Sequence, residues 1–252
     1  MNADSKNTEA QLPTIAEQRK FWDWHWRHWR ERRTINPWKE QRHRVLLSLI
    51  RSLPVDRPKI LDLGCGHGWF TAKLAHLGEA TGIDLSEEGI QMASSQHPNI
   101  RFIAGDLYNY PLPVDYFDVV VTQEVIDHVE DHVAFVDRAA RVLKSQGYFI
   151  VSCANKFVVD RLGNEFPEQP PAHIATYLGL ADLKRLLSSR FKLIQARSIL
   201  PVAGSRGILR LVNSHKVNTA LGCVLPHRYL EAFKERAGFG YQLVALAQKR
   251  ES

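Results

Sequence analysis

The 252-residue sequence is long enough for one large domain and too short for two independent enzyme domains. Hydrophobic residues make up 44% of it and charged residues 24%, which excludes a disordered, collagen-like or membrane-embedded chain. The formal net charge is +6, and residues 20–44 hold eight basic and three acidic side chains, or +5 of that charge. The same stretch contains five of the six tryptophans.

The first residues are polar, and we expect a disordered tail over residues 1–19. They lack the apolar run of a secretory signal, and no stretch of about eighteen consecutive apolar residues follows. The three cysteines form no CxxC pair, which argues against a disulfide framework or a structural zinc. We therefore expect a reduced, cytoplasmic protein.

Residues 20–58 are predicted to form a helical cap on the domain. On a helix, Trp22, Trp26 and Trp29 share one face and Trp24 points the opposite way. We interpret that face as the side that packs on the domain as a lid, with Trp26 contacting the substrate. Peripheral membrane contact stays open as an alternative. Nucleic acid is disfavoured because the basic patch is one helix long and the remaining chain is only +1.

From residue 59 onward, short apolar runs alternate with amphipathic stretches, which is typical of a parallel sheet covered on both faces. We therefore predict a Rossmann-like α/β domain over residues 59–252 with a seven-stranded, mostly parallel sheet. The predicted strands are 59–63, 80–83, 100–103, 117–122, 148–152, 191–196 and 242–247. The predicted helices are 69–77, 87–97, 132–143 and 180–189.

Two connections are long for a compact domain, namely residues 154–179 and the insertion 198–239 before the last strand. Long connections often serve as lids or binding elements, so we expect both to cover a substrate. A dimer contact is the alternative for the insertion, and both a monomer and a homodimer fit the sequence.

The strongest local motif is ILDLGCGHG at residues 60–68, a buried strand that runs into a glycine-rich turn and then a helix. Gly64 and Gly66 permit positive φ angles and a close approach of the backbone to a ligand. The following helix N-terminus offers unpaired N–H groups. Dinucleotide enzymes use a similar turn, so the motif alone does not identify the ligand.

Acidic residues follow the next two predicted strands at equal spacing. Asp84 comes 22 residues after Asp62, and Asp106 comes 22 residues after Asp84. A carboxylate at the end of the second strand can accept hydrogen bonds from ribose hydroxyls, and Asp106 can accept one from an adenine amino group. All three lie at the carboxyl edge of the sheet, where open α/β folds bind ligands.

In these motifs the sequence resembles the class I S-adenosylmethionine-dependent methyltransferases. The resemblance covers residues 59–153 and includes GIDLS, AGDL, FDVVVTQEVIDHVED and LKSQGYFIVSC. It implies the class I methyltransferase fold, with S-adenosyl-L-methionine as cofactor and S-adenosyl-L-homocysteine as product. It also implies a cofactor site whose residues include Asp62, Gly64, Cys65, Gly66, Asp84, Leu85, Asp106 and Leu107.

Within that superfamily the chain resembles the ubiquinone-biosynthesis type of small-molecule O-methyltransferase at residues 34–37 and 124–129. This resemblance implies that Arg44 binds the cofactor carboxylate and that Gln123 makes a backbone contact near the sulfonium. Arg42 is a rival for the arginine position. Beyond residue 155 the sequence departs from that type, so the resemblance does not identify the substrate.

His128 is the candidate general base, because histidine titrates near neutrality and this one follows the fourth predicted strand. Glu124, Asp127 and His128 stand at i, i+3 and i+4, so on a helix they would share a face. They are candidate catalytic residues, and a divalent metal held by all three is an alternative. His173 and Tyr177 are expected to contact the substrate.

The sequence therefore predicts a methyltransferase that acts on a small molecule, with a hydroxyl oxygen as acceptor, in-line attack and base assistance. Alternatives are a nitrogen or carbon acceptor, a non-catalytic S-adenosylmethionine-binding protein and an oxidoreductase. The identity of the acceptor stays open.

Overall fold

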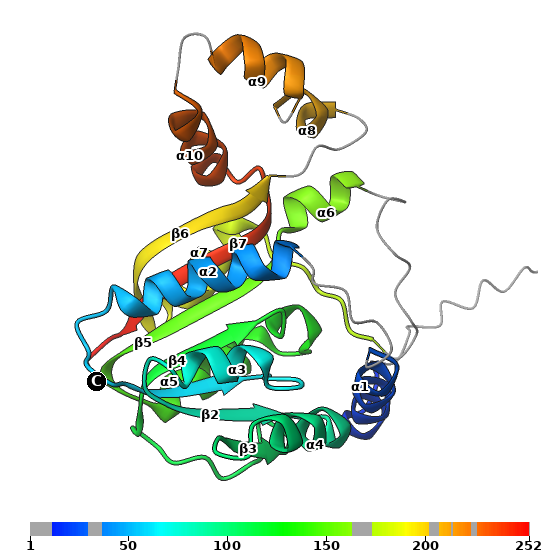
Figure 1. Ribbon diagram of the computed structural model, residues 1–252, viewed down its shortest axis with the longest axis vertical. Coiled ribbons are helices and arrows are strands. Elements are labelled where there is room, and N and C mark those ends of the chain that lie inside the picture. The colour runs from blue at the N-terminus through cyan, green and yellow to red at the C-terminus, as the bar shows by residue number, and fades with distance from the viewer. Residues whose placement is uncertain are drawn as a thin grey trace, which may run out of the picture.

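The computed structural model describes residues 12–29, 37–162, 173–201, 207–212, 214–222 and 226–251. Its centre is a seven-stranded sheet in the order β3-β2-β1-β4-β5-β7-β6 (Figure 1). The strands are β1 (Lys59–Leu63), β2 (Glu79–Asp84), β3 (Arg101–Ala104), β4 (Phe117–Gln123), β5 (Leu143–Ala154), β6 (Phe191–Pro201) and β7 (Gly240–Lys249). Strands β1 to β5 pair in parallel, and β7 runs antiparallel to β5 and β6. The predicted Rossmann-like sheet is confirmed.

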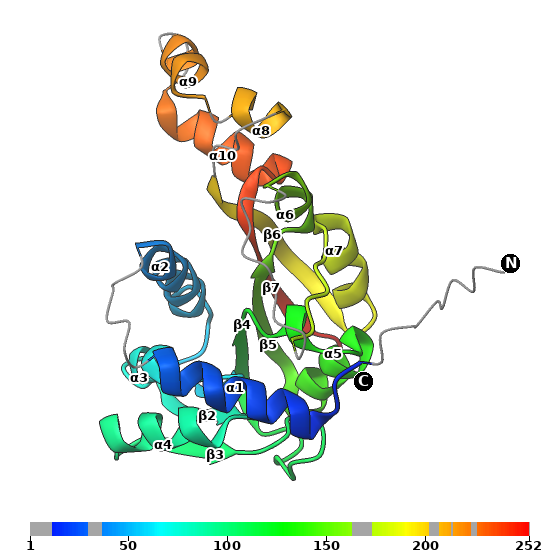
Figure 2. The same ribbon diagram turned by 90° about the vertical axis from the view of Figure 1, so that its right-hand side faces the viewer.

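Helices cover both faces of this sheet (Figure 2). The helices are α1 (Ile15–Trp29), α2 (Pro37–Arg51), α3 (Trp69–Leu74), α4 (Glu87–Gln96), α5 (His132–Val142), α6 (Lys156–Leu162), α7 (Leu180–Ser188), α8 (Gly207–Val212), α9 (His215–Gly222) and α10 (His227–Ala237). Apolar side chains of α2 and α3 join one buried cluster, and those of α5 and α7 join the other.

The central strands contribute alternate residues to the two clusters. In β4, Val119 and Val121 belong to the cluster under α2 and α3, whereas Val120 belongs to the cluster under α5 and α7. All three side chains are fully buried. This explains why β4 reads as a continuous apolar run, as expected for a parallel strand covered on both faces.

All seven predicted strands and the four predicted helices are present, and the differences lie at their ends. The largest is at β5, which begins at Leu143 instead of residue 148. Leu143 pairs with Phe117, and a register irregularity then separates Phe117 from Val119. The strand therefore includes the polar residues 144–147, which the sequence pattern predicted as a turn before it.

The N-terminal cap starts earlier than predicted, because α1 begins at Ile15 and not after residue 19. Thr14 Oγ1 accepts a hydrogen bond from the Glu17 amide, and the Glu17 carboxylate accepts one from the Thr14 amide. This reciprocal capping box fixes the start of the helix. Residues 1–11 of the predicted tail lie outside the described residues.

The insertion before β7 forms α8, α9 and α10, which project beyond the ends of β6 and β7 (Figures 1 and 2). Arg197 Nη1 of β6 lies 2.6 Å from Glu235 Oε2 of α10, and Ser198 Oγ donates to the Glu235 carbonyl. Among the helices in the described ranges, none has the length and apolar character needed to cross a bilayer.

Candidate active site

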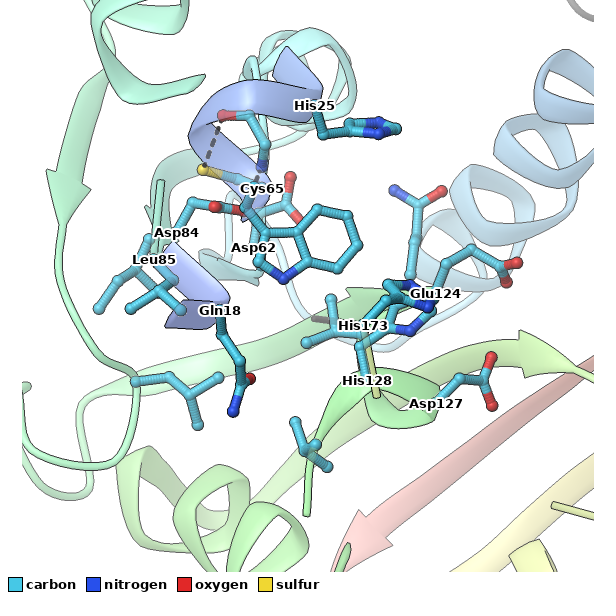
Figure 3. Close-up of a pocket in the computed structure, with 18 of the residues that line it drawn as sticks. Gln18, His25, Asp62, Cys65, Asp84, Leu85, Glu124, Asp127, His128 and His173 are labelled. Carbon is cyan, nitrogen blue, oxygen red and sulfur yellow. Dashed lines mark hydrogen bonds between the residues drawn. The ribbon is translucent and has the colours of Figure 1, made fainter. Parts of the chain in front are cut away.

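A cavity of about 1070 Å³ opens at the carboxyl ends of β1, β2 and β4, the sheet edge where the sequence predicted a ligand. The turns after these strands form one side of it, and α1 and α2 contribute much of the rest (Figure 3). Five tryptophans of the described residues line it: Trp22, Trp24, Trp26, Trp38 and Trp69. Its size and aromatic lining are typical of a small-molecule site.

The glycine-rich turn after β1 is held in place by backbone contacts. The amides of Gly64 and Cys65 donate to the Ile83 carbonyl at 2.8 and 3.0 Å. Gly66 adopts a φ of +54°, and a Cβ there would lie 2.3 Å from Cζ2 of Trp26. The turn therefore requires glycine at residue 66, and it places α1 directly over the backbone.

Asp84 at the end of β2 is oriented by two backbone amides. Its Oδ2 accepts from the Gly66 amide at 2.7 Å, and its Oδ1 accepts from the Ser86 amide at 2.9 Å. Burial raises the pKa of this carboxyl, and both hydrogen bonds oppose that shift. Ser86 Oγ in turn donates to Asp23 of α1 at 2.6 Å. Ser86 thus links helix α1 to Asp84, the residue predicted to bind the ribose.

Asp62 and Cys65 lie in the cavity wall beneath the glycine turn. Asp62 is almost fully buried, and its Oδ2 accepts from Thr71 Oγ1 of α3 at 2.6 Å. Burial raises the pKa of Asp62 to about 7 and the pKa of the Cys65 thiol well above its ordinary value. The thiol is therefore protonated and unreactive at neutral pH.

The three residues predicted to bind the adenine are found in the same cavity. Leu85, Asp106 and Leu107 all line the cavity. Asp106 Oδ1 accepts from the Tyr108 amide at 3.0 Å, which orients the carboxylate at the start of the turn after β3.

Arg42 and not Arg44 reaches the cavity, so the structure favours the rival of the two arginine positions. Arg42 lines it with 7% exposure, and its Nε donates to Gln123 Oε1 at 3.2 Å. Arg44 is exposed to solvent on α2. Residues two apart on a helix point about 200° away from each other, so only one of the pair can face the site. Gln123, for which a backbone contact near the sulfonium was predicted, also lines the cavity.

His128 lies in the same cavity, on a single 3-10 turn formed by Ile126–His128. Its Nδ1 lies 2.8 Å from the Ile174 carbonyl, so Nδ1 carries the proton and the Nε2 lone pair stays available. Burial lowers its pKa below 6.5, so the ring is neutral at pH 7. The predicted substrate residue His173 lies beside it, with ring centroids 4.3 Å apart (Figure 3).

The expectation that Glu124, Asp127 and His128 share a helical face is wrong. Glu124 adopts a φ of +57°, and the helix after it is only one turn long. Asp127 Oδ2 accepts from the Ala154 amide at 2.8 Å, and Glu124 Oε1 lies 3.5 Å from Arg42. Across the described ranges, no three histidine, cysteine, aspartate or glutamate side chains gather as a metal ligand set.

Trp26 and Tyr177, the other two residues predicted to contact the substrate, also line the cavity. The described residues between 198 and 239, a segment predicted to cover a substrate, do not line it. These helices extend away from the strand ends that form the site (Figure 2). The segment 154–179 contributes Ala154, His173 and Tyr177, and its residues 163–172 lie outside the described part.

Several cavity residues were missed in the sequence. His25 follows Trp22 by three residues, so helical periodicity places it on the same face as Trp22 and could have identified it. Gln242 and Tyr241 come from β7, and no local motif marked them. Their position follows from the antiparallel pairing of β7 with β5, which sets Gln242 opposite Ala154.

Comparison with known proteins supports the resemblance to methyltransferases. A family model described as "Methyltransferase domain" (Methyltransf_11) matches residues 61–151. A "Probable S-adenosylmethionine-dependent methyltransferase" of Mycolicibacterium smegmatis is 30% identical over 150 residues, which cover 59% of this chain and 57% of that protein. A fatty-acid O-methyltransferase of the same organism is 32% identical over 105 residues, covering 40% of this chain and 38% of the relative. The matched segments thus span about half of each relative or less.

Solved structures extend the likeness to most of the fold. The N-methyltransferase NodS of Bradyrhizobium japonicum, solved with S-adenosyl-L-homocysteine, aligns with a TM-score of 0.58 and 21% identity. The alignment covers 87% of this chain and 91% of NodS. The predicted class I methyltransferase fold is confirmed, and the comparisons support the predicted enzyme class and cofactor.

Proposed function

With a methyltransferase domain over residues 61–151 as the premise, we propose that this protein transfers a methyl group from S-adenosylmethionine to a hydroxyl oxygen of a small molecule. One observation supports the proposal above the others. The glycine turn, the oriented Asp84 carboxylate and a neutral His128 with an available Nε2 line the same cavity.

The residues present fit the cofactor. Asp84 would accept from the ribose hydroxyls, Asp106 would accept from the adenine amino group, and Arg42 would donate to the carboxylate. Gly64 and Gly66 leave room for a close backbone approach. When bound, S-adenosylmethionine supplies an activated methyl group, so the chain mainly has to place the acceptor in line with it and exclude water.

His128 supplies the base that a hydroxyl acceptor needs. The Ile174 carbonyl fixes its tautomer, and burial keeps the ring neutral at pH 7. Nε2 takes the hydroxyl proton as the new oxygen–carbon bond forms. A well-placed general base typically contributes roughly 10²- to 10⁴-fold in rate.

The lid favours a small acceptor over a macromolecule. Helix α1 lies against α4 through Asp23 and Ser86, through Arg19 and Glu87 at 3.1 Å, and through a contact of Arg27 with Glu88. Together with α2 it narrows access to the strand ends. An acceptor that reaches His128 has to fit beneath these helices.

The relatives suggest a lipophilic acceptor. One relative is named for fatty acids, and the chain resembles the ubiquinone-biosynthesis type at residues 124–129. The aromatic wall made by Phe21, Trp22 and Trp26 suits such a molecule. Trp24 also lines the cavity and is 53% exposed, so a lipophilic acceptor or a membrane surface could contact it.

The proposal is tested by transfer of a radiolabelled methyl group from S-adenosylmethionine to a panel of lipophilic alcohols, phenols, amines and carboxylic acids. We expect transfer to hydroxyl acceptors, with kcat reduced about 10²-fold or more in His128→Gln. His76→Gln, exposed after α3 and outside the cavity lining, is the matched control. Full activity of His128→Gln on a hydroxyl acceptor would overturn the assignment of the base, and exclusive transfer to amines would overturn the oxygen acceptor.

A further inference from the structure

The loop after β3 brings Asp106 and Leu107 to the cavity without a helix or strand of its own. It spans residues 105–116, between the end of β3 and the start of β4. Side chains on a loop are positioned less precisely than those on a strand or helix, unless other parts of the fold hold the loop. The contacts that hold this loop therefore bear on how well the cavity binds a ligand.

Arg138 of α5 connects the loop to the rest of the domain. Its Nε donates to the Leu107 carbonyl at 2.7 Å, and its Nη2 donates to the Tyr110 carbonyl. Because a guanidinium presents its N–H donors in a rigid planar fork, this one side chain fixes two points of the loop. On the same helix, Phe135 and Ala139 are fully buried in the core. The loop is thus tied to a helix whose position the core determines.

The Asp106 carboxylate takes its orientation from the same loop. Its Oδ1 accepts from the Tyr108 amide at 3.0 Å, and its Oδ2 accepts from Asn109 Nδ2 at 2.5 Å. Tyr108 Oη donates to the carbonyl of Asp131, the N-cap residue of α5, at 3.2 Å. The direction of the carboxylate therefore depends on loop atoms that Arg138 and Tyr108 hold against α5.

The charge of Arg138 also acts on this loop. In the part of the chain that the structure describes, Arg138 forms no salt bridge, and its hydrogen bonds go to the two loop carbonyls. Burial, followed by repulsion from Arg141, lowers the pKa of the guanidinium, and the Asp106 carboxylate opposes the shift. The guanidinium and this carboxylate thus attract each other across the loop.

We propose that Arg138 is a positioning residue for the cofactor, which acts through Asp106 and makes the cavity selective for adenine over hypoxanthine. The amino group of adenine can donate to a carboxylate, whereas the carbonyl of hypoxanthine would place two acceptors against each other. A carboxylate distinguishes the two rings only while it is held in place and cannot turn away to water. The inference rests on the cofactor assignment in the proposed function, and it does not depend on the methyl acceptor.

The test compares S-adenosylhomocysteine with S-inosylhomocysteine, whose ring carries a carbonyl in place of the amino group. Calorimetry with the full chain measures the ratio of the two Kd values. We expect the unmodified protein to bind S-adenosylhomocysteine about 10- to 150-fold more tightly, the range for one hydrogen bond to a charged group. Arg138→Met removes the donors and should lower this ratio about threefold or more. Arg141→Met, exposed on the same helix and outside the cavity lining, is the matched control and should keep the ratio.

A double-mutant cycle separates positioning from a general loss of structure. Asp106→Asn should itself remove most of the preference, because an amide can turn and donate to the carbonyl of hypoxanthine. In that background Arg138→Met should leave the ratio unchanged, since Arg138 acts through the carboxylate. Arg138→Lys keeps the charge without the planar fork, so we expect a ratio between those of Arg138→Met and the unmodified protein. Thermal unfolding without ligand checks that each variant is folded.

An unchanged ratio in Arg138→Met would overturn the inference, and so would an equal fall in Arg141→Met or an equal fall in the Asp106→Asn background. Should Arg138→Met fail to fold, Arg138→Lys and its control Arg141→Lys make the same comparison, and an unchanged ratio in Arg138→Lys is then the overturning result. Equal binding of both ligands by the unmodified protein, or binding of neither, would also overturn it. Failure of methyl transfer to hydroxyl acceptors, together with the expected ratios, would count against the proposed function alone.

Discussion

Arg42 and Arg44 provide a matched test of the cofactor site, because the same residue type stands on opposite sides of α2. Arg42 is 7% exposed and lines the cavity, whereas Arg44 is exposed to solvent. We expect Arg42→Gln to weaken the binding of S-adenosylhomocysteine and Arg44→Gln to leave it unchanged. Glutamine is chosen because it can still donate a hydrogen bond to Gln123.

The expected size follows from the contacts that Arg42 makes. A hydrogen bond between a guanidinium and a carboxylate contributes about 1.5–3 kcal/mol, which corresponds to about a 10- to 150-fold change in Kd. Arg42 also contacts Gln123 at 3.2 Å and Glu124 at 3.5 Å, so part of its interaction energy is already present without the cofactor. We therefore expect a loss of about tenfold to a hundredfold.

Isothermal titration calorimetry with S-adenosylhomocysteine measures both variants directly. Thermal unfolding of each variant without ligand separates weakened binding from a loss of folding. A Kd for Arg42→Gln within about twofold of the unmodified protein would refute the placement of the cofactor carboxylate, and so would equal losses at Arg42 and Arg44.

Three further predictions address the turn, the base and a buried carboxyl. Gly66→Ala should weaken S-adenosylhomocysteine binding and lower Tm, because the added Cβ would collide with Trp26. Gly207→Ala is the control, because Gly207 also has a positive φ of +65° but no atom lies within 4 Å of the added Cβ. In unfolding titrations it should show only the backbone cost of about 1–2 kcal/mol. Methyl transfer should fall as pH decreases through a pKa below 6.5, because His128 acts in its neutral form, and His128→Gln should lack this limb of the pH profile. The folded pKa of Asp62 is raised from 3.8 to about 7, so the folded state binds more protons in that window and the free energy of unfolding should fall as pH rises from about 4 to about 7. In Asp62→Asn, urea titrations at several pH values should show a smaller decrease of the unfolding free energy with pH. An unchanged pH dependence would contradict the raised pKa of Asp62.

The sequence was sufficient for the strands and for the cofactor edge because both depend on local patterns. Asp62, Asp84 and Asp106 each follow an apolar run. The carboxyl ends of parallel strands lie at the same edge of the sheet, independently of the length and structure of the connections. Trp22 and Trp26 of the predicted tryptophan face line the cavity, as helical periodicity indicated, but Trp24, which was predicted to point the opposite way, lines it as well.

The remainder of the site depends on geometry that local patterns do not contain. The choice between Arg42 and Arg44 required the rotation of α2 about its axis, and a two-residue shift reverses the answer. The turn at Glu124 required a positive φ in a residue other than glycine, which the sequence does not signal. Gln242 reaches the cavity through the register of β7 against β5, a long-range pairing.

The central claim is that the strand ends bind S-adenosylmethionine, and calorimetry with the full chain tests it most directly. The account predicts that S-adenosylmethionine binds with one equivalent per chain, more tightly than NADH, and that Asp84→Ala weakens this binding about tenfold or more. Absence of binding, tighter binding of NADH, or an unchanged affinity in Asp84→Ala would contradict it.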